Sequence, residues 1–279
     1  MHIETLPGVG AEITGVDLRH VTDGAFDAIR EAYAAHGVIF FRDQTLSEED
    51  HLAFAERWAP INVNRFFAAH PKYPQIAMVA KEADQKDNIG GGWHTDHSYD
   101  EIPAMGSILV ARVLPETGGD TFFASMYRAY ETLDDATKAE IEGLRGVHSA
   151  KQIFGSQAKT YYSKTDAGGE RIGNAAAADV LDDVVHPLVI THPLSGKKAL
   201  YVNPAFTVGI AGWTQEASMP LLAKLFAHAM NMENAYRFSW KPGSVAFWDN
   251  RSTWHWALND YHGQRRIMHR ITLEGCALN

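Results

Sequence analysis

Apolar and polar positions repeat along this chain with two periods, and the longer one predicts helices. Within residues 23–35 the apolar positions recur every three or four residues, as in an amphipathic helix, and residues 37–41 follow as a short buried strand. Ser47 precedes an acidic cluster and is typical of a helix N-cap, which predicts a helix to about Trp58. Similar signals predict a short helix from Ser125, a helix over 134–144, and a helix over 218–230 with Pro220 near its first turn.

The shorter period predicts strands. Short runs with strand character, bounded by turn residues, lie at 8–18, 106–113, 119–123, 188–191, 199–202, 244–248 and 266–273. Because these strands do not alternate with helices, we predict a mainly β protein with an antiparallel double sheet or jelly roll. Residues 157–178 show little periodicity and are predicted as a mobile loop or active-site lid. Without a repeat or a clear linker, residues 1–279 are predicted as one domain.

Composition and net charge indicate which binding partners and which cell compartment to expect. Hydrophobic residues make up 46% of the chain, which is ample for a packed core, and the net charge of −9 argues against a nucleic-acid or anionic-membrane partner. The single cysteine, Cys276, excludes an intrachain disulfide framework and fits a reducing cytosol, so we expect a cytoplasmic protein. We find no signal-peptide pattern and no apolar run long enough to span a bilayer.

The first segment with candidate chemistry is His94-Thr95-Asp96. In an extended chain, residues two apart project from one face, so His94 and Asp96 can bind one metal ion, with His255 supplied by another strand. Two imidazoles and a carboxylate suit iron, manganese or zinc, and three protein ligands leave coordination positions open. A zinc hydrolase stays an alternative, and so do ordinary hydrogen-bonded histidines, because the chain has 14 of them.

The second segment is the predicted strand 266–273, which carries Arg266 and Arg270 on one face. Two guanidinium groups are costly to bury in one cavity unless each meets an anion, and a guanidinium can clamp a carboxylate or sulfonate with two hydrogen bonds. Arg266 follows His255 closely enough for one turn and an adjacent strand. We therefore predict two anion sites beside the metal, the alternative being pairing with Asp or Glu or a hydrated sheet edge.

Together these motifs resemble a known family. Trp-His-Thr-Asp at 93–96, Gly-Gly-Asp-Thr at 118–121, Trp-Asp-Asn-Arg at 248–251 and Arg-Arg-Ile-Met-His-Arg at 265–270 are similar to the taurine dioxygenase/TfdA family of iron(II)- and 2-oxoglutarate-dependent dioxygenases. The resemblance covers nearly the whole chain and implies a double-stranded β-helix, or jelly roll, with flanking helices. It also implies that O2 is used to hydroxylate a substrate while 2-oxoglutarate is decarboxylated to succinate and CO2. A non-catalytic jelly-roll module that binds a metal or an anion is the alternative from another functional class.

The resemblance implies a role for each matching residue. They are the iron ligands His94, Asp96 and His255, the 2-oxoglutarate-binding Thr121 and Arg266, and the substrate-binding His70, Tyr73, Phe154, Phe206 and Arg270. In this set Arg270 and His70 would hold the anionic group of the substrate. Trp248 and Asp249 are expected to be structural.

One departure from the family pattern narrows the range of substrates that we expect. Taurine dioxygenase has an asparagine just before the Trp-His-Thr-Asp motif that helps to bind taurine, whereas this chain has Gly90-Gly-Gly-Trp93, so taurine itself is not expected. Residues 148–156 and 201–203 resemble the aryloxyalkanoate dioxygenases of the same family. We expect a small anionic substrate of the aryloxyalkanoate or alkylsulfonate type. We also expect a homo-oligomer, a dimer or a tetramer, with no nucleic-acid or membrane partner.

Overall fold

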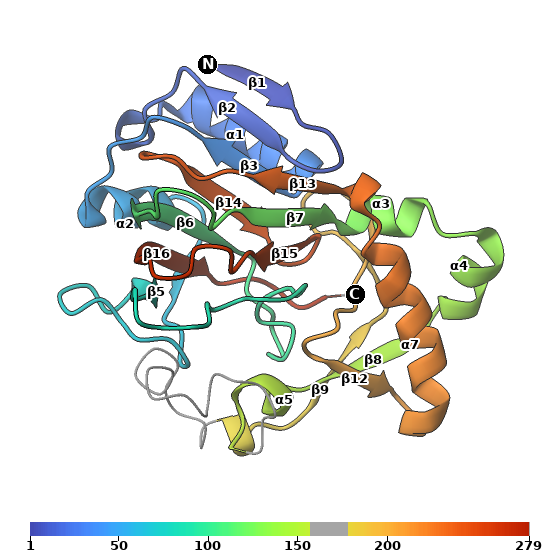
Figure 1. Ribbon diagram of the computed structural model, residues 1–279. Helices are drawn as coiled ribbons and strands as arrows, with labels where there is room; N and C mark the ends of the chain where they lie inside the picture. Colours follow the sequence, from blue (N-terminus) through green and yellow to red (C-terminus); the bar gives the residue numbers. More distant parts are fainter. Residues whose placement is uncertain (157–177, 279) are drawn as a thin grey trace.

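Two sheets face each other and form the centre of the molecule; their strand pairs are antiparallel except for the parallel pair of the second and third strands of the chain (Figure 1). A computed structural model describes residues 1–156 and 178–278, so the predicted loop or lid at 157–178 lies, apart from its last residue, outside the described residues. The larger sheet has the order β1-β2-β3-β14-β6-β16-β4, and β5 also pairs with β16. Its strands are β1 (His2–Thr5), β2 (Ala11–Thr14), β3 (Val38–Phe41), β4 (Ile61–Asn62), β5 (Ala77–Lys81), β6 (Gly106–Val113), β14 (Val245–Asp249) and β16 (Arg266–Leu273).

The smaller sheet lies across the core from the larger one and has the order β13-β7-β15. Its strands are β7 (Thr121–Ser125), β13 (Ala235–Phe238) and β15 (Thr253–Ala257). A third sheet and a hairpin complete the strands; they consist of β8 (Arg145–His148), β9 (Val184–Pro187) and β12 (Thr207–Ile210), and of β10 (Val189–Thr191) and β11 (Lys198–Leu200). The paired sheets agree with the predicted jelly roll.

Helices cover the outside of the sheets. They are α1 (Asp23–His36), α2 (Glu48–Glu56), α3 (Met126–Glu131), α4 (Asp135–Ile141), α5 (Lys151–Phe154) and α7 (Gln215–Ala229), with short 3-10 turns at Leu18–His20 and Met232–Asn234. Ser47 caps α2 as predicted, in a reciprocal capping box with Asp50. Thr22 caps α1, which ends at Gly37 in the left-handed region that favours glycine. These local signals fix where the helices begin and end.

Side chains of the larger sheet alternate between two cores. Phe40, Trp248 and Met268 point to the core between the two sheets. Phe41 and Ile271 point the other way, to the core under α1 and α2. Because strand side chains alternate, this register places Arg266 and Arg270 of β16 on the inner side with Met268. The strand that was predicted to carry two arginines on one face thus turns that face to the interior.

Several predicted boundaries are corrected by the structure. The strands predicted at 106–113 and 266–273 match β6 and β16, whereas β7 begins only at Thr121, because Gly118 and Gly119 both have positive φ and form a turn. Helix α7 begins at Gln215 with Thr214 as its N-cap, so Pro220 lies inside the helix and not in its first turn. Arg266 was expected on a strand adjacent to that of His255, and this is wrong. Strands β15 and β16 belong to different sheets, and residues 258–265 cross between them.

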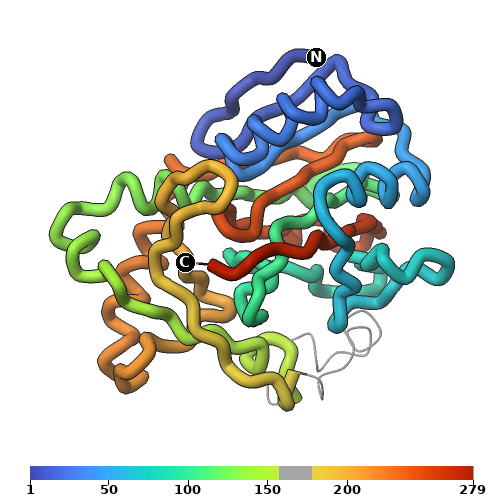
Figure 2. Tube along the Cα trace, turned by 180° about the vertical axis from the view of Figure 1, so that it is seen from behind, coloured from blue at the N-terminus to red at the C-terminus, as the bar shows by residue number. Residues whose placement is uncertain are grey.

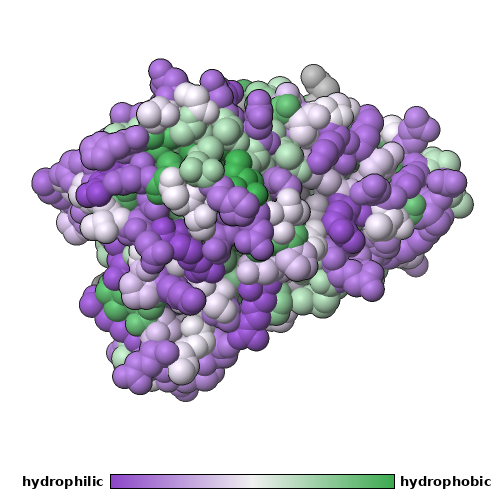
Figure 3. Space-filling view, turned by 90° about the horizontal axis from the view of Figure 1, so that it is seen from above, coloured by the Kyte–Doolittle hydropathy of each residue, from purple (hydrophilic) through white to green (hydrophobic). Residues whose placement is uncertain are grey.

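The termini and the surface add two observations. The N-terminus lies beside the β1–β2 hairpin at one end of the molecule, and the C-terminus lies near the middle (Figures 1 and 2). The face seen from above is mostly hydrophilic, with hydrophobic side chains only in small groups (Figure 3). Within the described part of the chain, we find no helix that is long and apolar enough to cross a membrane.

Candidate active site

His94 and His255 face each other across a direct backbone pair. The His94 N–H donates to the His255 carbonyl at 3.1 Å, and the His255 N–H donates to the His94 carbonyl at 2.8 Å. This is an isolated antiparallel bridge, so the segment 94–96 forms no longer strand. Side chains of an antiparallel pair project from the same face, and the centroids of the two imidazoles lie 4.1 Å apart. Strand β15 thus positions the imidazole of His255 directly and that of His94 through the backbone pair.

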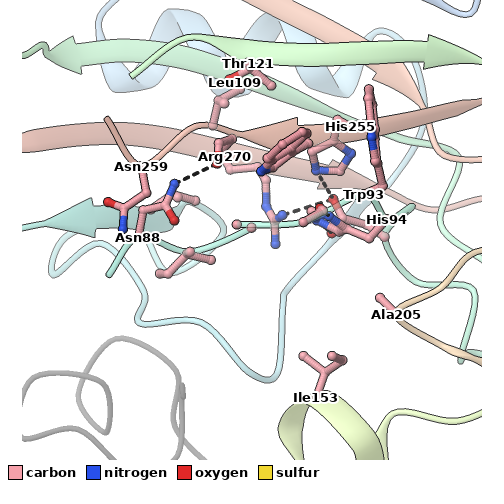
Figure 4. A pocket seen from close by; sticks show the side chains of 18 of the residues that line it. Asn88, Trp93, His94, Leu109, Thr121, Ile153, Ala205, His255, Asn259 and Arg270 are labelled. Carbon is pink, nitrogen blue, oxygen red and sulfur yellow. Dashed lines mark hydrogen bonds and ion pairs between the residues drawn. The ribbon is translucent and has the colours of Figure 1, made fainter. Parts of the chain in front are cut away.

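Asp96 completes a cluster of three possible metal ligands. Its carboxylate oxygens lie 3.8 Å from His94 Nε2 and 3.8 Å from His255 Nε2. One donor atom from each residue lies within 4.8 Å of the others. His94 Nδ1 lies 2.7 Å from the Gly92 carbonyl and donates to it, which leaves the Nε2 lone pair directed at the cluster. The structure therefore brings the three predicted ligands together (Figure 4).

Burial and neighbouring charges set the protonation states of Asp96 and His255. Burial alone would raise the pKa of Asp96, but Arg270, His255 and His94 outweigh it, and the pKa lies well below its usual range. Burial, reinforced by His94, lowers the pKa of His255 well below its usual value. At neutral pH Asp96 is therefore charged and His255 neutral, as metal ligands must be.

Thr95 lies between His94 and Asp96 and is hydrogen-bonded to the turn that leads to His255. Its hydroxyl donates to the carbonyl of Asn250, in the turn that joins β14 to β15. The Asn250 N–H in turn donates to the Met105 carbonyl at 2.9 Å. Thr95 is buried, so this hydrogen bond is shielded from water. The turn leading to His255 is thus fixed relative to His94 and Asp96.

A cavity of about 720 Å³ opens beside the three ligands, and both Arg266 and Arg270 line it. On each arginine, Nε and Nη2 are buried and have no hydrogen-bond partner among the described residues. Figure 4 shows Arg270 pointing toward His94 and His255, with Ile153 and Ala205 across the cavity. Buried guanidinium donors without a partner are a fit for anionic ligands, because leaving such donors unpaired is costly.

Arg266 and Thr121, from the two facing sheets, both line this cavity and share Trp240 as a neighbour. The Arg266 guanidinium lies 5.6 Å from the Trp240 ring, and Trp240 Nε1 donates to Thr121 Oγ1 at 3.0 Å. Burial lowers the pKa of Arg266. A bound carboxylate would compensate for the water that this guanidinium loses on burial. The residues present therefore fit a dicarboxylate cosubstrate beside a metal ion.

The structure places some of the predicted substrate-binding residues at the cavity and others away from it. Phe154, Phe206 and Arg270 line the cavity, whereas His70 and Tyr73 do not. The His70 ring packs 5.1 Å from the ring of His269, which lies on the opposite side of β16 from Arg270. The structure thus does not bring His70 to the anion that Arg270 would hold.

His70, Glu48 and His269 form a second cluster of possible metal ligands on this outer side. Their lone pairs are already engaged: Arg112 Nε donates to His269 Nδ1 at 3.1 Å, and the Tyr73 N–H donates to His70 Nδ1 at 3.2 Å. The Arg112 guanidinium, 3.6 Å from Glu48, already supplies a positive charge there. We therefore interpret this cluster as a hydrogen-bonded charge network and not as a metal centre.

Phe67 is a cavity residue that the sequence did not reveal. Its ring lies 4.3 Å from the Arg270 guanidinium, and it lines the cavity. It belongs to a non-periodic segment between β4 and β5, where the two adjacent aromatics Phe66 and Phe67 are the signal that could have pointed to it. Asp249 has a structural role: its buried carboxylate accepts hydrogen bonds from Arg251 and His192.

Comparison with known proteins identifies the family. Residues 2–272 match the family described as "Taurine catabolism dioxygenase TauD, TfdA family". The chain belongs to the TauD/TfdA family. It is 36% identical over 276 residues to an alpha-ketoglutarate-dependent sulfate ester dioxygenase from Pseudomonas putida, covering 96% of this chain and 87% of that one. It is 31% identical to an (S)-phenoxypropionate/alpha-ketoglutarate-dioxygenase from Sphingobium herbicidovorans, covering 95% and 92%.

Solved structures agree with the TauD/TfdA assignment. A putative alpha-ketoglutarate-dependent taurine dioxygenase from Burkholderia xenovorans has a TM-score of 0.82 at 32% identity, covering 99% of this chain and 93% of that one. AAD-2 in complex with Mn(II) and N-oxalylglycine has a TM-score of 0.78 at 31% identity, covering 98% and 97%. The chain is a non-haem iron(II)- and 2-oxoglutarate-dependent dioxygenase, which confirms the predicted family, jelly-roll fold, reaction class and cofactors. The zinc hydrolase and the non-catalytic module are not favoured.

Proposed function

We propose that this dioxygenase hydroxylates a small organic anion of the aryloxyalkanoate or alkylsulfonate type. The observation that carries the proposal is a second buried guanidinium in the cavity, that of Arg270, whose Nε and Nη2 have no partner among the described residues. Arg266 accounts for the cosubstrate, so Arg270 is available for a substrate anion. Phe67, Phe154 and Phe206 offer apolar walls for the remainder of such a molecule.

Each site residue has one role in this proposal. His94, Asp96 and His255 bind iron(II), and Thr121 and Arg266 bind the distal carboxylate of 2-oxoglutarate. When bound, iron(II) with 2-oxoglutarate and O2 supplies the oxidation that places a hydroxyl on a substrate carbon, with release of succinate and CO2.

Arg270 holds the substrate next to the metal ligands. Its Nη1 donates to Asp96 Oδ2 at 3.1 Å, so an anion on its other donors lies close to Asp96. If the hydroxylated carbon carries a sulfonate or an ether oxygen, its C–S or C–O bond breaks as the hydroxyl loses its proton and becomes a carbonyl. The products are then a carbonyl compound and sulfite or a phenol. Phe67 and Phe154 offer apolar surface on this side of the cavity.

A substrate panel tests the proposal. Alkylsulfonates, alkyl sulfates and aryloxyalkanoates are supplied with iron(II) and 2-oxoglutarate, and O2 consumption is recorded for each compound. We expect substrate-dependent O2 consumption with at least one class, and none with neutral analogues that lack the anionic group. Equal O2 consumption with charged and neutral analogues would contradict a role for the anion.

We also propose that the enzyme acts in the cytoplasm as a homo-oligomer, a dimer or a tetramer. The single cysteine, which fits a reducing compartment, supports the location. Light scattering coupled to gel filtration measures the assembly, and cell fractionation measures the location. A monomer at micromolar concentration, or recovery outside the cytoplasm, would overturn the respective part.

A further inference from the structure

His97, directly after the iron ligand Asp96, has an unusual backbone conformation. Its φ is 60°, in the left-handed region that residues other than glycine rarely adopt. Its side chain is buried, with 2% relative exposure for the residue. A conformation of this kind persists when the surrounding structure compensates for its cost. The contacts of the imidazole show what provides that compensation.

The imidazole of His97 joins two segments through a chain of hydrogen bonds. Asn64 Oδ1 accepts from the Phe66 N–H at 2.9 Å and from the Phe67 N–H at 3.1 Å. The other end of this amide, Nδ2, therefore faces His97 Nε2 at 3.2 Å and must donate to it. His97 Nε2 is thus the acceptor, so Nδ1 carries the proton and donates to Asp100 Oδ2 at 2.7 Å.

Asp100 closes the network. Its second carboxylate oxygen accepts from Arg65 Nη2 at 2.6 Å, and its backbone carbonyl accepts from His186 Nε2 at 3.0 Å. His186 lies on β9, so Asp100 is anchored to a separate sheet. Residues 64–67, which we call the 64–67 loop, are therefore held at two points by the segment 97–100.

The 64–67 loop in turn supports the aromatic walls of the cavity. Phe67 packs on Arg270, as described above, and Phe66 stacks on Phe154 with ring centroids 4.3 Å apart and an interplanar angle of 15°. Tyr99 packs edge-on against Phe66 at 5.8 Å and against Phe206 at 4.7 Å. Movement of this loop would therefore move the substrate side of the cavity. Thr121 and Arg266, at the cosubstrate side, take no part in these contacts.

We propose that His97 is a specificity-determining positioning residue that fixes the 64–67 loop and thereby the Phe67 and Phe154 walls around the substrate. This inference rests on the proposed function, because it assigns those walls to the substrate. His97 acts through Asn64 and Asp100 and touches neither the substrate nor the cosubstrate. Its removal should therefore affect substrate binding more than cosubstrate binding.

His97→Gly is the primary test, because glycine adopts the positive φ readily and the variant removes only the imidazole. His20→Gly, at an exposed histidine outside the cavity, is the matched control. The probes are 2-phenoxypropionate and hexane-1-sulfonate, and KM is measured separately for the probe and for the cosubstrate. We expect the probe KM to rise about tenfold or more for the accepted probe, with kcat and the cosubstrate KM changed less than about twofold.

A second readout does not depend on activity. Hydrogen exchange of the metal-free protein reports on the Phe66 and Phe67 amides, which donate to Asn64. We expect them to exchange at least about tenfold faster in His97→Gly, with the His94 and His255 amides unchanged. Asn64→Asp, which keeps an acceptor for both amides but cannot donate to His97, should raise the probe KM with a smaller change in exchange.

The possible outcomes separate the two proposals. Unchanged exchange in His97→Gly overturns the inference, and so does an equal rise in the probe KM and the cosubstrate KM. If the wild type oxidises neither probe, the proposed substrate class fails, while the exchange comparison still decides whether His97 holds the 64–67 loop. If His97→Gly exchanged faster across the whole protein, His97 would have only a general stabilising role. That result would also overturn the inference.

Discussion

Arg270 connects Asp96, which we propose as an iron ligand, to the part of the cavity that we assign to the substrate. Its Nη1 donates to Asp96 Oδ2 at 3.1 Å, while its Nε and Nη2 have no partner among the described residues. Both residues are buried, so each hydrogen bond to this guanidinium is made in a medium of low polarity. One side chain thus couples the position of a substrate anion to the geometry of the metal ligands.

Arg270→Leu should uncouple the reaction. A charge-assisted hydrogen bond contributes roughly 1.5–3 kcal/mol, so loss of the anion clamp should raise the substrate KM by about one to two orders of magnitude. Succinate formation should continue slowly without matching product. The measurement is the ratio of succinate to hydroxylated product. A ratio that stays at the wild-type value would show that Arg270 does not hold the substrate.

Arg266→Gln should weaken binding of the cosubstrate, 2-oxoglutarate, with little effect on the substrate KM. Gln keeps an amide donor but loses the charge and one of the two hydrogen bonds to a carboxylate, so we expect the cosubstrate KM to rise by about tenfold to a hundredfold. Thr121→Val, which removes one hydroxyl, is the graded comparison and should cause a smaller rise. Steady-state kinetics at saturating substrate measure the cosubstrate KM of both variants. An unchanged cosubstrate KM in Arg266→Gln would remove this arginine from the cosubstrate site.

Arg266→Met should stabilise the ligand-free protein even though it impairs activity. The wild-type guanidinium is buried with Nε and Nη2 unpaired, and burial lowers its pKa more than nearby Asp120 and Asp260 raise it, so its charge is only partly compensated in the ligand-free state. Replacing it with an apolar side chain should raise the unfolding free energy by about 1–4 kcal/mol. Urea denaturation without iron or 2-oxoglutarate measures the change. A lower unfolding free energy would indicate that this charge is already compensated.

Thr95→Val should weaken iron binding without removing a ligand. The variant leaves the buried Asn250 carbonyl without its hydroxyl donor, which costs about 1–3 kcal/mol of stability. The turn before His255 is then less well fixed, and loss of such an outer contact typically lowers metal affinity about tenfold to a hundredfold. Thr132→Val is the control, since it removes the 2.7 Å bond to the Arg128 carbonyl at an exposed position. Equal iron affinity in the two variants would refute the role of Thr95.

The metal-free protein should lose stability as the pH falls below about 6.5. Burial lowers the pKa of His51 and of His148 to about 3, so both are neutral when folded and take up protons on unfolding. Their contribution is fully present above the unfolded pKa and is lost as the pH falls toward the folded value. His51→Phe should flatten this dependence between about pH 7 and pH 5, with exposed His2→Gln as the control. Parallel pH profiles for wild type and His51→Phe would contradict the assignment.

The sequence was most informative where burial imposed a simple pattern. Strands β6 and β16 lie inside the larger sheet with apolar side chains on both faces, and their predicted bounds match the structure. His255 was expected on a strand, but the bounds of β15 were not predicted from the hydrophobic pattern, because that pattern is inverted. Its inward residue is the polar His255, while Trp254 packs outward with α7. In so short a strand, this inversion left no apolar alternation from which the strand could be predicted.

Site residues were predictable where a motif fixed their spacing, and less so elsewhere. His94, Asp96, His255, Arg266 and Arg270 line one cavity in the structure. His70 was expected beside Arg270, but the face of the sheet on which a loop residue packs depends on tertiary contacts, here with His269. For the same reason the sequence did not reveal that His97 is hydrogen-bonded to Asn64, which in turn accepts from the Phe67 N–H.

The central claim is that His94, Asp96 and His255 hold iron(II) beside a 2-oxoglutarate site. Its most direct test is anaerobic addition of iron(II) and then 2-oxoglutarate to the wild type and to His255→Ala, followed by visible absorption. The account predicts a charge-transfer band in the wild type that requires both additions and is absent from His255→Ala. A wild type without the band, or a band of equal strength in His255→Ala, would contradict the account.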